Sequence, residues 1–194
     1  MPVITNIEDL RQVARRKLPK AIFEYVDHGS YDQVSLAANR DDLKAIRFRQ
    51  RVLINADNRQ LATTMLGEKV AMPIAIAPTG LTGLLRGNGE MLAARAAEAA
   101  GIRFCLSTMS ICSIEDVREA TKAPFWFQLY VFRDRGFSES VIERAKAAGC
   151  TALFEPSTCR CAASAIATSR TGWKYRRGSP REMPLILPPS RPGR

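Results

Sequence analysis

The sequence predicts an α/β protein whose core is a parallel β-sheet. From residue 74 onward, short apolar segments that suit buried strands alternate with segments of helical periodicity. The apolar segments recur roughly every 20 to 30 residues, and Gly101 and Gly149 close two of the helical segments. This alternation is typical of right-handed βαβ units, and both an open doubly wound sheet and a (β/α)8 barrel are compatible with it.

The N-terminal segment predicts two helices. Asn6 suits the N-cap of the first helix, and the Leu-Pro pair at Pro19 interrupts the helical pattern. The pattern then restarts, and we expect the second helix to end with Gly29 as its C-cap. His28, the one histidine of the chain, is predicted to be a helix-end residue rather than a base or a ligand. Residues 30–70 are predicted to be connecting structure.

Four strands and three helices are predicted after this connection. The strands are 74–77, 104–107, 125–131 and 150–154, and the helices are 89–100, 113–120 and 138–148. Ser113 begins a segment that looks like a capped helix start. The glycine-rich fingerprint of dinucleotide-binding folds does not follow the first strand, which argues against that architecture.

The first predicted strand ends in the run Pro78-Thr79-Gly80, which is the leading candidate for a ligand-binding loop. Parallel α/β folds bind their ligands at the carboxyl ends of the strands. Proline has no backbone N–H, so Thr79 and Gly80 must supply any donors there. Gly80 has no Cβ and would let a flat ligand approach the backbone. The alternative is an ordinary strand end.

Composition limits the classes of protein to consider. The chain has 194 residues, 46% of them hydrophobic, which is ample for a core. It shows neither a signal peptide nor an apolar run of about 18 residues, so we expect a cytoplasmic protein, either free or peripheral at the inner face of the cell membrane. None of the five cysteines forms a CxxC pair, and Cys159-x-Cys161 is a weak metal signal, so reduced thiols and no metal site are predicted.

Residues 1 to about 153 contain a series of specific motifs. The motifs are Lys17-Leu-Pro-Lys20, Phe23-Glu-Tyr-Val-Asp-His-Gly29, Asp32-Gln33, Ala38-Asn-Arg40, Pro73-Ile-Ala-Ile-Ala-Pro-Thr-Gly80, Gly89-Glu90, Leu106-Ser-Thr108, Phe127-Gln-Leu-Tyr130, Arg133-Asp-Arg135 and Ala145-Lys-Ala-Ala-Gly149. Together they resemble the FMN-dependent α-hydroxy-acid dehydrogenase/oxidase family. The run from Phe127 to Gly136 and the Leu-Thr-Gly after Gly80 look most like the L-lactate dehydrogenase branch.

The resemblance implies the first half of an FMN-binding TIM barrel, four strand–helix units at most, that oxidises a 2-hydroxy acid to a 2-keto acid. It assigns Pro78, Thr79 and Gly80 to the flavin edge, Ser107 and Gln128 to the flavin pyrimidine, Tyr25 to the substrate carboxylate, and Tyr130 to the reacting hydroxyl. It also implies a quinone, a cytochrome or oxygen as electron acceptor, no nucleic-acid partner, and frequent homo-oligomers. All these residues except Tyr25 fall at predicted strand ends, where barrel enzymes build their sites.

The resemblance stops after Leu153, and the composition changes there. Residues 157–194 carry eight Lys/Arg against one acid and five of the eleven prolines. Residues 157–175 can be written back as a nucleotide sequence, with one codon chosen for each residue. When that sequence is read one base earlier, it encodes a run that contains Arg-Asp-Ile-Lys-Asn-Gly, which is close to the family's continuation. We therefore interpret residues 154–194 as an out-of-frame, disordered tail that follows an N-terminal segment (1–70) and half a barrel (71–153).

This interpretation predicts an inactive chain. The family's catalytic His, both of its substrate-binding Arg, the Lys beside the flavin and most of the phosphate site belong to the half that the resemblance does not reach. The alternative function is non-catalytic, because a basic tail could bind nucleic acid or a membrane surface.

Overall fold

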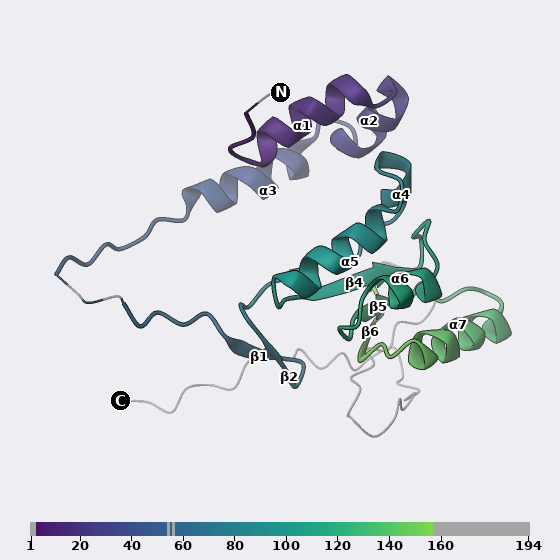
Figure 1. Ribbon diagram of the computed structural model, residues 1–194. Helices are drawn as coiled ribbons and strands as arrows, with labels where there is room; N and C mark the ends of the chain where they lie inside the picture. The colour runs from purple at the N-terminus through teal and green to yellow at the C-terminus, as the bar shows by residue number, and fades with distance from the viewer. Residues whose placement is uncertain (1–2, 54, 56, 157–194) are drawn as a thin grey trace, which may run out of the picture. The chain divides into compact units, whose positions relative to one another are not determined.

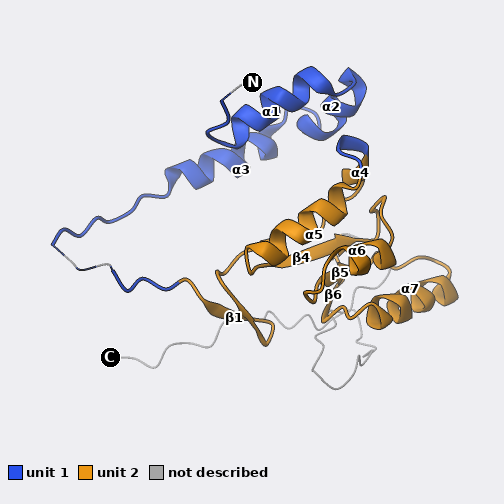
Figure 2. Ribbon diagram, in the orientation of Figure 1, with its two compact units in different colours: residues 1–60, 84–87 blue, residues 61–83, 88–194 orange. Residues whose placement is uncertain are grey.

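A computed structural model describes residues 3–53, 55 and 57–156 and divides the chain into two compact units (Figures 1 and 2). The N-terminal unit holds residues 1–60 and 84–87, and the second unit begins at residue 61 and resumes at residue 88. The predicted tail from residue 157 lies outside the described residues.

The described residues 3–53 of the N-terminal unit contain the helices α1 (Ile7–Lys17), α2 (Lys20–Asp27) and α3 (Val34–Ala45). The prediction that Asn6 caps α1 is confirmed. The Asp9 amide donates to Asn6 Oδ1 at 3.1 Å, and the Asn6 amide donates back to Asp9 Oδ2 at 3.2 Å. This reciprocal pair satisfies two amides that the first helical turn leaves without partners.

Two N-terminal predictions are wrong. Helix α2 ends on an extended His28 (φ −92°), so Gly29 is not a left-handed C-cap. Residues 30–70 are not simply connecting structure, because they contain α3 and a β-hairpin. Helix α3 follows a left-handed Gln33 (φ 58°) and has no side-chain cap and no buried residue, so neither a cap nor an apolar stripe marked it in the sequence.

The hairpin belongs to the second unit and pairs β1 (Thr63–Met65) with the antiparallel strand β2 (Glu68–Val70). Both turn residues, Leu66 and Gly67, have positive φ, the pattern of a type I′ turn. An ion pair of 2.5 Å between Arg103 Nε and Glu68 Oε2 attaches the hairpin to the larger sheet.

The larger sheet consists of β3 (Ala75–Ile76), β4 (Arg103–Ser107), β5 (Trp126–Gln128) and β6 (Ala152–Phe154), in that order and all parallel. The predicted strand sequence and direction are therefore confirmed. The register pairs Ser107 with Gln128, and Gln128 with Phe154, so three strands end level with one another. Each strand is shorter than its predicted segment or begins within a residue or two of it.

Four helices follow the strands: α4 (Thr82–Leu85), α5 (Gly89–Ala99), α6 (Ile114–Ala120) and α7 (Arg135–Ala147). Ser113 caps α6 with a capping box, as predicted. Gly101 (φ 65°) and Gly149 (φ 80°) follow α5 and α7 in the left-handed conformation that favours glycine. Helix α7 begins three residues earlier than predicted, because the Asp134 side chain accepts from the Phe137 amide and caps it there.

The helices cover one face of the sheet. Residues that alternate along the strands pack against α5, α6 and α7 in the main core (Phe104, Leu106, Phe125, Phe127, Leu129 and Leu153 against Ala94, Ala97, Ile114, Val117, Val141 and Ala145). The other face carries a second, smaller cluster of Cys105, Trp126 and Ala152 with Met65 and Ala75. A doubly wound sheet has helices on both faces, whereas a barrel has them on the outside only, so this arrangement favours a barrel.

None of the described helices is long and apolar enough to cross a membrane.

A bidentate ion pair between α6 and α7 generates a prediction about acid stability. Arg144 donates to both Glu115 oxygens, at 2.8 and 2.6 Å, and its hydrogen bonds lower the pKa of Glu115 to about 2. Because the folded-state pKa lies below the ordinary value, the stabilisation is fully present above about pH 4.5 and is lost as the pH falls towards 2. Glu115→Gln should therefore flatten the decline of the urea midpoint between pH 4.5 and 2.

Glu139→Gln, an exposed acid on α7, is the matched control and should keep the wild-type profile. Parallel profiles for wild type and Glu115→Gln would contradict the assignment.

Candidate functional site

The loop after β3 presents the run Pro78-Thr79-Gly80, and all three residues are exposed. The Thr79 hydroxyl donates to the Ala77 carbonyl at 3.3 Å, and the Thr82 hydroxyl donates to the Thr79 carbonyl at 3.1 Å. The donors in both bonds are side-chain hydroxyls, so the backbone amides of Thr79 and Gly80 take no part in them. An exposed loop of this kind at a strand's carboxyl end can offer its amides to a ligand.

Ser107 and Gln128 lie side by side at the ends of β4 and β5, and both are buried. The Ser107 hydroxyl donates to Gln128 Oε1 at 2.9 Å and accepts from the Met109 amide at 3.1 Å. Gln128 Nε2 is buried and has no hydrogen-bond partner among the described residues. A buried amide nitrogen without an acceptor costs free energy, so this pair is suited to bind a polar group at the strand ends.

Thr108 links the same two strand ends to Tyr130. Its hydroxyl donates to the Gln128 carbonyl at 2.6 Å, and the Tyr130 amide donates to the Thr108 hydroxyl at 3.0 Å. The backbone amide of Thr108 bonds the same Gln128 carbonyl at 2.9 Å. Tyr130 is half-buried, and its backbone is thereby fixed beside Gln128. Sequence reasoning did not assign Thr108 a role, although its position after Ser107 at a strand end was a usable signal.

Tyr25 lies on α2 in the N-terminal unit, where it is 70% exposed. The structure therefore brings together Ser107, Gln128 and Tyr130 through Thr108, and places Pro78, Thr79 and Gly80 at the end of a strand of the same sheet. Tyr25 belongs to the other unit, and its carboxylate-binding role stays a prediction.

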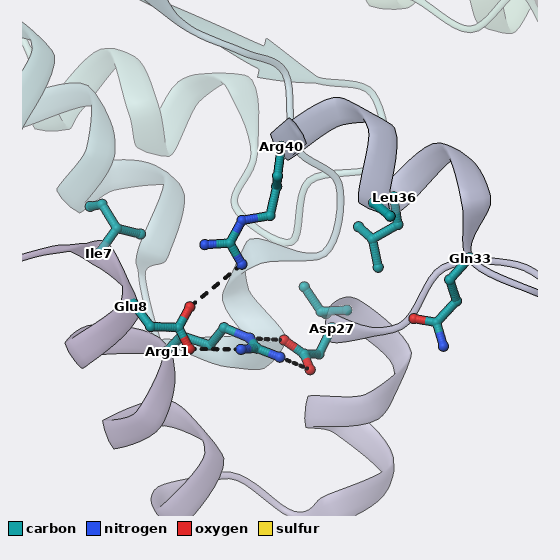
Figure 3. Close-up of a pocket in the computed structure, with 9 residues that line it drawn as sticks. Ile7, Glu8, Arg11, Asp27, Gln33, Leu36 and Arg40 are labelled. Atoms are coloured by element: carbon teal, nitrogen blue, oxygen red, sulfur yellow. Dashed lines mark hydrogen bonds and ion pairs between the residues drawn. The ribbon is translucent and has the colours of Figure 1, made fainter. Parts of the chain in front are cut away.

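The N-terminal unit has a cavity of about 540 Å³ of its own, shown in Figure 3. Arg11 reaches Asp27 and Glu8 within it, and Arg40 lies 3.6 Å from Glu8. These two cations and two carboxylates neutralise one another. None of the predicted site residues lines this cavity, and its paired charges give it no evident preference for an anionic ligand.

Comparison with known proteins decides the family. The sequence profile described as FMN-dependent dehydrogenase matches residues 14–157. The chain belongs to the FMN-dependent dehydrogenase family. It is 49% identical over 151 residues to an L-lactate dehydrogenase of Caulobacter vibrioides, covering 78% of this chain and 39% of that protein. It is 52% identical over 151 residues to an L-lactate dehydrogenase of Vibrio parahaemolyticus, covering 78% of this chain and 40% of that protein.

The fold of this chain is similar to that of a solved structure. It is a soluble mutant of the membrane-associated (S)-mandelate dehydrogenase from Pseudomonas putida, with a TM-score of 0.74 and 38% identity over 79% of this chain and 44% of that chain. The chain thus spans about 40% of the length of the curated relatives that it matches. These likenesses confirm the prediction of an incomplete TIM barrel.

The residues at the strand ends fit FMN, the cofactor of the family. The pyrimidine edge of a flavin presents a carbonyl acceptor, an N–H donor and a second carbonyl acceptor. Gln128 Nε2 has no acceptor among the described residues, and Ser107 Oγ, which donates once and accepts once, keeps one lone pair. The donor and acceptor capacity that remains therefore complements that edge.

The Thr108 bridge can be tested by Thr108→Val, which keeps the shape and removes the hydroxyl. The change leaves the part-buried Tyr130 amide unpaired, so the free energy of unfolding should fall by about 1–3 kcal/mol. Denaturant unfolding measures this loss, and faster hydrogen exchange of the Tyr130 amide should accompany it. Thr64→Val, on the exposed strand β1, is the control and should change neither. Unchanged exchange at Tyr130 in the variant would show that the bridge is not formed.

Proposed function

We propose that this chain supplies the first half of the flavin site of an FMN-dependent dehydrogenase that oxidises a 2-hydroxy acid of the L-lactate type. The observation that carries the proposal is the buried Nε2 of Gln128, which has no hydrogen-bond partner in the described part of the chain and lies beside Ser107 at the carboxyl end of a parallel sheet. The two curated L-lactate dehydrogenases, about half identical over the matched region, support the choice of substrate class.

FMN, when bound, accepts the two electrons that the substrate loses. The amides of Thr79 and Gly80 would bind one edge of it, with Pro78 alongside. Ser107 and Gln128 would hold the pyrimidine and so fix the plane in which the ring lies. Tyr130 would direct its hydroxyl to the substrate hydroxyl or the carbonyl that replaces it, and Tyr25 would hold the substrate carboxylate. Each of these residues binds or orients a group, and none of them is the base.

By resemblance to the family, the base that takes the proton of the substrate hydroxyl is a histidine. The one histidine of the printed sequence, His28, is the C-cap of α2, in the N-terminal unit. We therefore propose that the chain as printed does not turn over 2-hydroxy acids, because proton transfer is typically worth about 10² to 10⁴ in rate. A quinone, a cytochrome or oxygen would take the electrons, in a homo-oligomer free in the cytoplasm or peripheral at the inner face of the membrane.

Binding of FMN tests the cofactor half of the proposal. The purified chain should quench the fluorescence of added FMN. Gln128→Leu should weaken that affinity about tenfold, because one buried hydrogen bond is worth about 1–1.5 kcal/mol. Gln60→Leu, at an exposed position outside the strands, should bind as the wild type does. Equal affinities for the wild type and Gln128→Leu would refute the role of Gln128.

Turnover tests the role of Tyr130. In a gene whose codons beyond residue 153 are restored to the predicted frame, Tyr130→Phe should lower the rate of L-lactate oxidation by about ten- to a hundredfold, since it removes one hydroxyl from the reacting centre. Tyr31→Phe, fully exposed, is the control. An unchanged kcat and KM in Tyr130→Phe would contradict the assignment, and activity of the printed chain itself would contradict the proposed loss of function.

A further inference from the structure

The loop that follows β3 is held against the loop that follows β4. The Leu81 amide donates to the Met109 carbonyl at 2.8 Å. A Cβ on Gly80 would lie 3.0 Å from the Met109 Cβ, and a Cβ on Gly83 would lie 2.6 Å from the Ile111 Cβ. The second distance is shorter than real Cβ contacts, so the two loops meet where only glycine fits. The first loop carries Pro78–Gly80 and the second follows directly on Ser107.

Glu90, in the first turn of α5, contacts both of these loops. Its Oε1 accepts from the Gly83 amide at 3.1 Å and from the Ile111 amide at 3.1 Å. The residue is 1% exposed, which is unusual for a carboxylate with no arginine or lysine among its partners in the described residues. One oxygen atom therefore ties the backbone of both loops to the same helix.

Glu90 remains a carboxylate in this position. Burial raises the pKa of its carboxyl, but hydrogen bonds from backbone amides, including those of Ile111 and Gly83, and from the Cys112 thiol more than offset burial and lower it. Oε2 has no hydrogen-bond partner among the described residues, and the Cys112 thiol is only a weak donor. The bonds that matter for geometry are thus the two at Oε1.

We propose that Glu90 is a positioning residue for the flavin site, whose carboxylate sets the loops after β3 and β4 at the spacing at which Pro78–Gly80 and Ser107 bind one FMN molecule. The inference rests on the proposed function, because it assumes that these residues meet the flavin. Without the two bonds at Oε1, the Leu81–Met109 bond would still join the loops, but the amides of Thr79 and Gly80 and the Ser107 hydroxyl would be held less rigidly relative to one another. Preorganised donors bind more tightly than mobile ones.

The same helix offers a matched control at its other end. Glu98 accepts from the Thr121 hydroxyl at 2.7 Å and from the amides of Lys122 and Ala123 at 3.2 and 3.0 Å. It therefore ties α5 to backbone amides in the same way. Its partners precede β5, at the opposite end of the sheet from Ser107 and Gln128. Loss of either glutamate removes two hydrogen bonds that backbone amides donate, and loss of Glu98 also removes the bond from the Thr121 hydroxyl, but of the two glutamates only Glu90 contacts the proposed flavin loops.

The experiment compares Glu90→Leu, Glu90→Gln and Glu98→Leu in the full chain. Three quantities are measured: hydrogen exchange of the Gly83 and Ile111 amides without FMN, the dissociation constant of FMN from fluorescence quenching, and the thermal midpoint. Glu90→Leu should speed hydrogen exchange at both amides and weaken the binding of FMN at least tenfold. Glu90→Gln keeps Oε1 as an acceptor, so its amide exchange and its FMN affinity should be close to those of the wild type. Glu98→Leu should leave both unchanged, whatever its midpoint.

If Glu90→Leu and Glu98→Leu weaken the binding of FMN equally, Glu90 contributes only to general stability and the proposal is overturned. Wild-type affinity for FMN in Glu90→Leu would overturn it as well. Failure of the wild-type chain to bind FMN would instead count against the proposed function. Amide exchange would then decide the positioning role alone, and exchange at Gly83 and Ile111 no faster in Glu90→Leu than in Glu98→Leu would refute it.

Discussion

The register between β4 and β5 is the constraint on which the candidate site depends. Cys105 and Ser107 share one face of β4, and Trp126 and Gln128 share the facing side of β5, because strand side chains alternate. Leu106 and Phe127 point to the other face, into the core under the helices. A slip of β5 by one residue would turn Gln128 into that core and Phe127 to the opposite face. The apolar core therefore fixes where the polar site lies.

The sequence predicted this sheet well, because its evidence is local. Glycines after α5 and α7, the Ser113 cap and the spacing of apolar runs each act within a few residues of the element that they mark. Helix α3 escaped prediction because Gln33 supplies no cap bond and the helix buries nothing. The wrong C-cap at Gly29 has a similar cause, since an extended His28 can end a helix as well as a left-handed glycine can.

The site was predictable only in part. Strand ends and family resemblance pointed to Ser107 and Gln128, and the hydrogen bond between them agrees with that placement. Thr108 and Glu90 have backbone partners about twenty residues away in the chain, at Tyr130 and Ile111. Every residue except proline has a backbone amide, so no sequence motif identifies which amide a distant side chain will bond. A buried glutamate near a helix start reads as an ordinary first-turn acid until its partners are seen.

The chemistry of the donors limits what this half of the barrel can do. Thr79, Gly80, Ser107 and Gln128 offer amides and a hydroxyl, all of them neutral. Neutral donors orient a ring, but charged donors form hydrogen bonds about twice as strong and are suited to a carboxylate or to developing negative charge. The set contains neither a cation nor a base. In the proposed site these neutral donors therefore serve to orient the cofactor, while charge compensation and proton transfer require residues outside this set.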